Sequence, residues 1–243
     1  MARFNTAIKI INQVAVEVGL DAEADPYSSE DKNMIKLQYL LNTAGTGLVM
    51  LYPWAILRKE ATITTDGSES YALLSDFSYK IDQTDWNRTA DLPMAGPLSA
   101  QDWSFILGRG LSADTFYASF RLMENEVYIL PTSVASGTDI RYEYLSRNWV
   151  STNSTTIAPA LDEISVGTNA PLFEPLIIQR YLKVKWYESI GADSTKAQAD
   201  FDQAFMFWAG KDKGGKILSL ARRGNNYPYL DAYRNTPDTN FGV

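Results

Sequence analysis

The spacing of apolar positions predicts helices at both ends of the chain. Over residues 4–18 an apolar residue recurs every three or four positions, and Gly19 follows as a helix stop. The same spacing predicts a second helix over about residues 30–51. After about residue 168 the helical period returns and predicts two more helices, with Gly191 between them. The predicted helices therefore flank a middle region that has a different pattern.

The middle region alternates apolar and polar residues, which is typical of β-strands. The period changes from about 3.6 to 2 at Lys59. The Asp66-Gly67 dipeptide predicts a hairpin turn, with residues 70–77 as the return strand. Residues 81–102 contain two prolines and a glycine and predict a long surface loop. Two further strands flank a tight turn predicted at Glu124-Asn125.

These elements together predict an α+β fold built in three parts. An amphipathic helix must bury its apolar face, so the helices of residues 1–58 and 168–212 are expected to pack together as a helical bundle. Residues 59–167 would then form an antiparallel β domain inserted into that bundle. Residues 213–243 are expected to form an extended C-terminal arm.

Two glycines in the sequence AGTG, Gly45 and Gly47, raise the question of a phosphate-binding loop. A P-loop requires a Lys-Ser or Lys-Thr pair after its last glycine, and a dinucleotide-binding loop requires a third glycine. Neither requirement is met, and the preceding residues have the period of a helix rather than of a strand. We expect these glycines to permit close packing of the backbone against a neighbouring element.

Composition restricts the chemistry that the chain can perform. The sequence has no cysteine and no histidine, which excludes disulfides, thiolate or histidine metal sites, serine triads and Cys-His dyads. Catalysis would have to depend on carboxylates, lysine or tyrosine. Because i and i+2 positions of a helix point to different sides, Asp200 and Asp202 are not expected to meet. A carboxylate-dependent cell-wall hydrolase remains an alternative, because two carboxylates suffice for glycoside hydrolysis.

The sequence predicts no cofactor and no metal site. Asp21, Glu23 and Asp25 alternate as calcium ligands do, but the glycine and the closing glutamate of a calcium loop are missing. The formal net charge of −7 argues against tight binding to nucleic acid. The longest apolar run, residues 47–57, has 11 residues, whereas a bilayer span needs about 20. The opening sequence lacks the pattern of a signal peptide, so we expect synthesis in a cytoplasm.

The C-terminal segment, residues 213–243, has glycines, prolines and spaced tyrosines without a sustained period. Such a segment cannot build a core alone. Its aromatic residues either fold back on their own domain or dock on another protein, and docked aromatics provide large contact areas. The same surface aromatics would also suit a carbohydrate-binding module, which is a second alternative. The predicted contact residues of this segment are Ile217, Leu218, Arg222, Arg223, Tyr227, Tyr229, Tyr233 and Phe241.

Several motifs in a fixed order resemble one family of virus proteins. They are LLNTAGTGLVMLYPWAILRKEATITT, YALLSDF, DWNR, GPLSAQDW, FRLMENEVYILP and YEYLSRNWV. In this order they resemble the head-to-tail adaptor (connector) proteins of tailed bacteriophages, including the tail tubular protein A type of short-tailed phages. The resemblance covers about residues 4–222, and none of its motifs is a catalytic signature, so no catalytic residue is carried over.

The resemblance implies a structural virion protein that assembles as a ring of twelve subunits beneath the portal. The C-terminal arm would bind the portal, and the opposite end would receive the tail nozzle or the next tail component. Double-stranded DNA would pass through the ring during packaging and ejection without sequence-specific binding. The acidic balance of the chain agrees with this expectation, since a basic channel would attract phosphates and slow the DNA. The expected location is the head-tail junction of the virion, and no membrane is involved.

Overall fold

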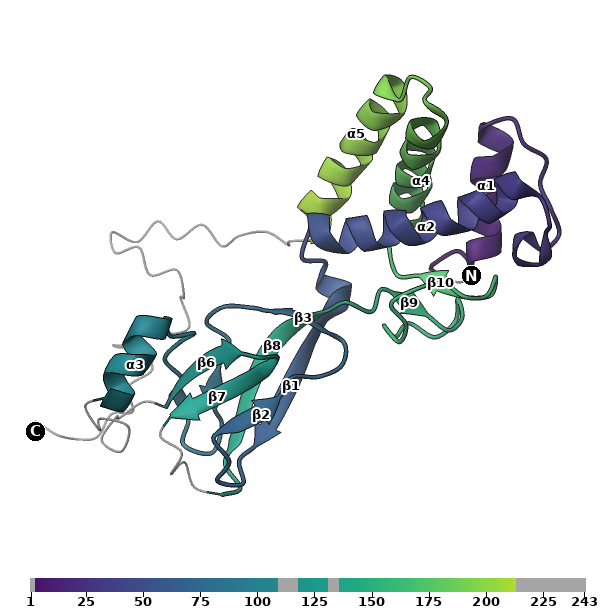
Figure 1. Ribbon diagram of the computed structural model, residues 1–243. Coiled ribbons are helices and arrows are strands. Elements are labelled where there is room, and N and C mark those ends of the chain that lie inside the picture. Colours follow the sequence, from purple (N-terminus) through teal and green to yellow (C-terminus); the bar gives the residue numbers. More distant parts are fainter. Residues whose placement is uncertain (1–2, 109–117, 131–135, 213–243) are drawn as a thin grey trace, which may run out of the picture.

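The computed structural model describes residues 3–108, 118–130 and 136–212. Within these residues the chain has a mixed α+β fold with antiparallel sheets, divided into a helical lobe and a β lobe (Figure 1). The helices are α1 (Ala7–Glu17), α2 (Lys32–Leu51), α3 (Ala100–Gly108), α4 (Pro175–Ile190) and α5 (Thr195–Asp212), with 3-10 turns at Pro26–Ser28 and Ala55–Leu57. The helices predicted from the apolar spacing at both ends of the chain are confirmed, although α1, α2 and α4 begin a few residues later than predicted.

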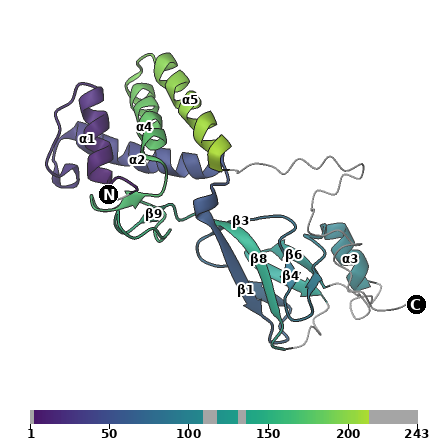
Figure 2. The same ribbon diagram turned by 180° about the vertical axis from the view of Figure 1, so that it is seen from behind.

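Four of these helices share one apolar core. Helix α2 lies across α1, α4 and α5, which stand on one side of it (Figures 1 and 2). The ends of the helices follow local chemistry: the side chain of Asp31 caps α2 by accepting a hydrogen bond from the N–H of Asn33 at 3.0 Å. Gly19 and Gly191 adopt positive φ angles of 84° and 71° where α1 and α4 end, as predicted from their positions.

The β lobe consists mainly of two sheets. In the larger sheet the strand order is β1-β8-β4-β5, with β3 also paired to β8, and in the smaller sheet it is β2-β7-β6. A short β9-β10 ribbon lies beneath the helical lobe (Figure 1). The strands are β1 (Arg58–Thr64), β2 (Ser70–Ala72), β3 (Phe77–Lys80), β4 (Trp86–Asn87), β5 (Leu92–Pro93), β6 (Ser119–Met123), β7 (Glu126–Leu130), β8 (Asp139–Ser146), β9 (Val150–Ser151) and β10 (Ala170–Pro171).

The hairpin predicted between residue 59 and residue 77 is wrong. The turn itself forms, since Gly67 has a φ angle of 93° and Asp66 accepts a hydrogen bond from the N–H of Ser68. However, β1 pairs with the distant strand β8 along its whole length, and β2 pairs with β7 in the other sheet. The turn therefore directs the chain from one sheet to the other, because the long strand β8 offers β1 more partners than the short β2 can.

The long loop predicted at residues 81–102 is more ordered than expected. It contains β4 and β5, and β4 extends the larger sheet by pairing Trp86 with Arg141. Helix α3 begins at Ala100, inside the predicted loop. The turn at Glu124-Asn125 is confirmed as the connection of the β6-β7 hairpin, and both residues have positive φ angles.

Strands β1 and β8 carry the β lobe away from the helices (Figure 2). The helical core extends past the predicted helices into the middle region, since Leu145 at the end of β8, Trp149, Val150 and Ile164 are buried in it. A separate core of aromatic and branched residues lies between the two sheets of the β lobe. None of the described helices is sufficiently long and apolar to cross a membrane.

Candidate functional site

The two glycines of AGTG lie within α2 and pack against aromatic rings. A Cβ atom built on Gly45 would lie 2.1 Å from the Cη2 atom of Trp149, whose side chain is only 1% exposed. A Cβ atom on Gly47 would lie 3.0 Å from the ring of Tyr181. The prediction of close backbone packing is confirmed for this stretch, and the helix around it contains none of the loop geometry of a phosphate site.

The difference between these two contacts predicts that alanine is destabilising at Gly45 and nearly neutral at Gly47. Replacing Gly45 by alanine should lower the free energy of unfolding by about 1–3 kcal/mol, because the new Cβ would overlap the ring of Trp149, which is fully buried and has no room to move away. Gly47→Ala is the matched control: its Cβ would need the ring of the partly buried Tyr181 to shift only slightly, so the gain in helix propensity of up to about 1 kcal/mol should offset the contact. Urea unfolding of both variants measures the difference. Equal destabilisation of both would contradict the packing explanation.

The acidic residues that we considered for catalysis or metal binding each accept hydrogen bonds from different neighbouring residues. Asp200 accepts a hydrogen bond from Lys196 at 2.8 Å, and Asp202 accepts one from Gln198 at 2.8 Å. The carboxylate of Asp25 accepts a hydrogen bond from the N–H of Tyr27 and caps a 3-10 turn. Over the described ranges no group of three or more acidic residues has the geometry to hold a metal ion.

An ion pair that the sequence did not indicate lies in the core of the β lobe. Lys80 donates a hydrogen bond to Asp85, and the two side chains are only 3% and 6% exposed. The ammonium of Lys80 also lies 4.0 Å from the centre of the Phe120 ring. Burial raises the pKa of Asp85 and lowers that of Lys80, and the attraction between the two groups opposes both shifts. Because both side chains are buried and pair with each other, we interpret them as part of the core.

A second carboxylate organises the connection between the two lobes. Asp76 accepts hydrogen bonds from Lys59 at 2.6 Å, from the hydroxyl of Tyr144 at 3.0 Å and from the hydroxyl of Ser146 at 2.8 Å. Burial raises the pKa of Asp76, but these hydrogen bonds outweigh burial and hold its pKa below the ordinary value. Lys59 also donates to the carbonyl oxygen of Pro159, at 3.1 Å. The network joins the beginning of β1 to the end of β8, where the β lobe leaves the helices.

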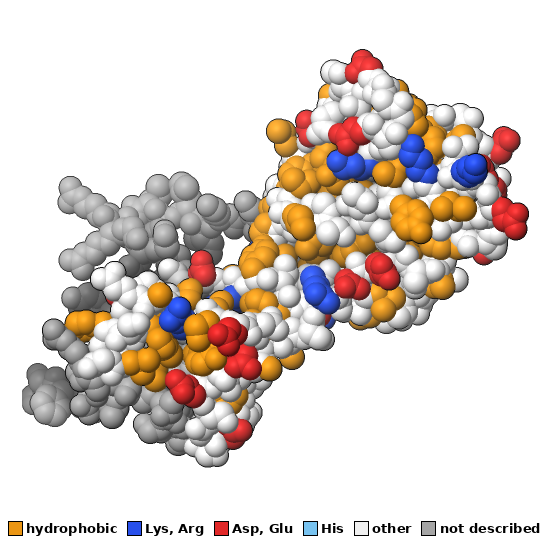
Figure 3. All heavy atoms as spheres, viewed as in Figure 1, with side chains coloured by type: hydrophobic (Ala, Val, Ile, Leu, Met, Phe, Trp, Pro, Cys, Tyr) orange, Lys and Arg blue, Asp and Glu red, His pale blue; other side chains and the backbone are white. Residues whose placement is uncertain are grey.

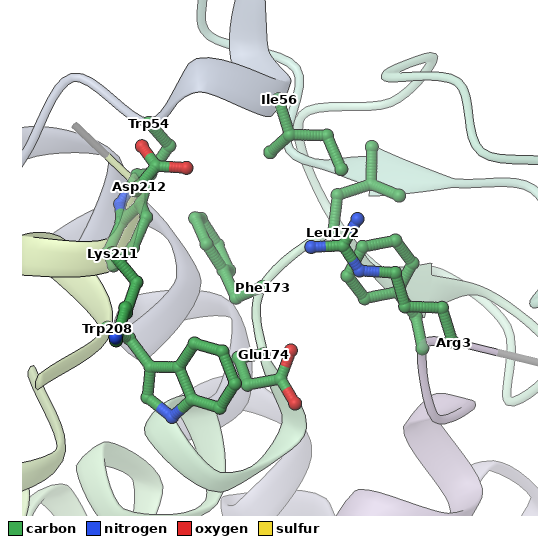
Figure 4. Close-up of a pocket in the computed structure, with 10 residues that line it drawn as sticks. Arg3, Trp54, Ile56, Leu172, Phe173, Glu174, Trp208, Lys211 and Asp212 are labelled. Carbon is green, nitrogen blue, oxygen red and sulfur yellow. The ribbon is translucent and has the colours of Figure 1, made fainter. Parts of the chain in front are cut away.

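A small pocket lies at the base of the helical lobe, beside the end of α5. Its volume is about 240 Å³, below the roughly 300–1,000 Å³ of typical small-molecule sites, so it suits a single side chain better than a cofactor. In Figure 4, Phe173 stands in the middle, and the charged groups of Arg3, Glu174 and Asp212 lie around it. The lining residues are Arg3, Phe4, Trp54, Ile56, Leu172, Phe173, Glu174, Trp208, Lys211 and Asp212.

Exposed apolar side chains gather over the C-terminal ends of α2 and α5 (Figure 3). Met50 is 81% and Leu51 51% exposed at the end of α2, and Met206 is 74% and Phe207 58% exposed on α5. The two helix ends are joined, because the hydroxyl of Tyr52 donates a hydrogen bond to the carbonyl oxygen of Ala209 at 3.1 Å. We refer to Met50, Leu51, Met206 and Phe207 as the apolar patch.

The residues predicted to contact another protein lie outside the described part of the chain. These are Ile217, Leu218, Arg222, Arg223, Tyr227, Tyr229, Tyr233 and Phe241. The described chain ends at Asp212, whose carboxylate accepts a hydrogen bond from the N–H of Ala55 at 2.8 Å. The described chain therefore ends beside the pocket, which Lys211 and Asp212 line.

Comparisons with protein-family models and with curated proteins found no match to this chain.

Proposed function

We propose that this chain is a structural protein of a tailed-bacteriophage virion, a head-to-tail adaptor that forms a ring between the portal and the tail. The observation that carries the proposal is the division of the chain into two lobes. Helices from both ends of the sequence share one core, and the strands between residues 58 and 146 form a β lobe with a second core of its own. This division agrees with the architecture that the sequence motifs of the adaptor family imply.

In this proposal the four helices are the bundle of the adaptor, and residues 213–243 are its arm. Twelve copies surround the channel through which double-stranded DNA passes during packaging and ejection. The arm binds the portal, and the opposite side of the ring receives the nozzle or the next tail component. The site of action is the head-tail junction of the virion. The network around Asp76 supports this role, because it would hold the two lobes in one orientation when DNA passes under pressure.

The experiment that tests the proposal mixes the purified chain with purified portal rings. We expect sedimentation of both proteins as one complex, and electron microscopy should show an added ring with twelve copies of the chain per portal. A chain that stays monomeric beside the portal but shifts on binding cell-wall glycans would instead indicate a carbohydrate-binding module. A lytic band on a cell-wall gel, abolished by one Asp→Ala change, would indicate a hydrolase.

A further inference from the structure

We propose that the exposed face of α2 binds the same face of a second copy of this chain, with the two α2 helices parallel. Five exposed residues recur every three or four positions along α2, which places them on one side of the helix. They are Ile35, Tyr39, Thr43, Thr46 and Met50, and we call them the α2 stripe. No charged residue occurs between Lys36 and Arg58, whereas the outer face of a surface helix ordinarily carries charged residues.

One flank of the α2 stripe is basic. Helix α4 packs along it, since a Cβ atom on Gly47 would meet the ring of Tyr181, and Lys36 donates a hydrogen bond to the carbonyl oxygen of Ser189 at 3.1 Å. Lys185 lies four positions from each of these two α4 residues, and its ammonium is 5.2 Å from the centre of the Tyr181 ring. Lys36 and Lys185 therefore bring positive charge to this flank.

The opposite flank is acidic. The amide of Asn42 donates a hydrogen bond to the carbonyl oxygen of Ile164 at 3.1 Å and accepts one from its N–H at 2.8 Å, so Asp162 and Glu163 lie beside α2 here. At about 100° per residue, Asn42 and Lys36 lie about 60° to either side of the centre of the stripe. Figure 3 shows blue side chains above a band of orange and white atoms on the helical lobe, and red side chains below it.

Each flank keeps a net charge after its own ion pairs are counted. Lys185 pairs with Glu188 at 2.9 Å, so two lysines less one glutamate leave the flank of Lys36 and Lys185 at +1. Asp162 pairs with Arg147 at 3.6 Å, so two acidic residues less one arginine leave the other flank at −1. The two flanks are therefore complementary to each other.

The positions of these charges along α2 select the occupant and its orientation. Lys185 lies between the levels of Lys36 and Gly47, and Glu163 lies at the level of Asn42, within the same interval. In a parallel two-fold pair of α2 helices, each level meets the same level of the other copy, and each basic flank faces an acidic one. An antiparallel pair would instead bring like charges together, which is unfavourable.

The size of the contact indicates a weak complex. Helix α2 has 20 residues, so a face about 30 Å long and about 10 Å wide offers about 300 Å². A stable interface buries about 800 Å² on each partner, so we expect the pair to dissociate on dilution. A two-fold contact closes on itself and builds no larger ring, so this inference does not depend on the proposed adaptor function.

Disulfide formation between copies tests the contact, because the natural chain has no cysteine. Thr43→Cys and Met50→Cys are made separately in the full-length chain, and Gln203→Cys, at an exposed position of α5, is the control. Residues 43 and 50 lie about 10 Å apart along α2, so only a parallel pair brings both within disulfide distance of their copies. At equal protein concentration both should form dimers on non-reducing gels at least about fivefold faster than the control.

A charge reversal on the acidic flank tests the orientation. Adding Glu163→Lys to Thr43→Cys should lower its rate at least about threefold, and Glu124→Lys, the same change on the β lobe, should leave the rate unchanged. An unaffected rate after Glu163→Lys would overturn the proposal, because the flank charges select the second copy. Dimers of Thr43→Cys without dimers of Met50→Cys would also overturn it, since they indicate an antiparallel or crossed pair.

A Thr43→Cys rate no higher than that of the control would show that no second copy covers the α2 stripe. The proposal would then be wrong, and loss of portal binding in Thr43→Asp would assign the stripe to the portal instead.

Discussion

Replacing Lys80 by methionine is expected to lower the free energy of unfolding by about 3–5 kcal/mol at pH 7. The side chain of Asp85 is buried in the β lobe, and Lys80 is the cation that the structure places against it. Methionine keeps the apolar part of the lysine side chain but loses the cation that lies over the Phe120 ring, a contact worth about 2 kcal/mol at most. The larger effect is a carboxylate left in the core without its partner. Urea unfolding of the natural chain and the variant measures the loss.

Two further variants separate this explanation from a general loss of packing. In Lys80→Met combined with Asp85→Leu, no buried charge remains, and most of the lost stability should return. Lys196→Met is the matched surface control, since the pair of Lys196 with Asp200 is largely exposed and the expected change is below about 1 kcal/mol. If Lys80→Met lowers the free energy of unfolding no more than this control does, then the charge of Asp85 does not depend on Lys80 for its stabilisation.

The pH dependence of the variant has a definite sign. Burial already raises the pKa of Asp85 in the natural chain, and removing Lys80 removes the attraction that opposes this effect. The folded variant then binds a proton more readily than its unfolded state does, so lowering the pH favours the folded state. The deficit of Lys80→Met relative to the natural chain should therefore shrink as the pH falls from 7 towards 5. A deficit that grows over this range would contradict the assignment of the buried charge to Asp85.

The parts of the fold that depend on neighbouring residues could be predicted from the sequence. The helix ends at Gly19 and Gly191 and the turn at Glu124-Asn125 are local, because a few adjacent residues determine their geometry. The close packing at Gly45 was also predicted, since glycines within a helical period suggest a near neighbour. The identity of that neighbour, Trp149, could not be predicted, because it lies about a hundred positions away in the sequence.

The parts that depend on distant partners were missed. Asp66-Gly67 forms its predicted turn, yet the strand that pairs with β1 is β8, and only the packing of the whole lobe selects that partner. Lys80 and Asp85 look in the sequence like ordinary surface residues of a polar stretch. Charged residues are almost never buried unless they are paired, and a pairing is visible only after the chain has folded. The apolar patch was missed for a related reason, because its four residues come from two separate helices.

Deleting residues 224–243 is expected to abolish attachment of the chain to portal-bearing heads while leaving its melting temperature nearly unchanged. The deleted segment carries Tyr227, Tyr229 and Tyr233, separated by Pro228 and Asp231 so that no single helix or strand can bury all three. In water such a segment gains too little burial to offset an ordering cost of about 1–2 kcal/mol per residue. In a groove on the portal each tyrosine could contribute about 1–3 kcal/mol.

The deletion keeps residues 213–223, so it removes the tyrosines and leaves the described lobes intact. Attachment is measured by mixing the chain with tail-less heads and counting the heads that acquire an added ring. Changing the three tyrosines to serine should reproduce the loss in a full-length chain, and changing Asn225 and Asn226 to serine is the matched control that should attach normally. Full attachment of the shortened chain would place the portal contact elsewhere on the molecule. Failure of the shortened chain to fold would instead mean that the tyrosines belong to its own core, because only a buried aromatic residue contributes to the folding of the domain that carries it.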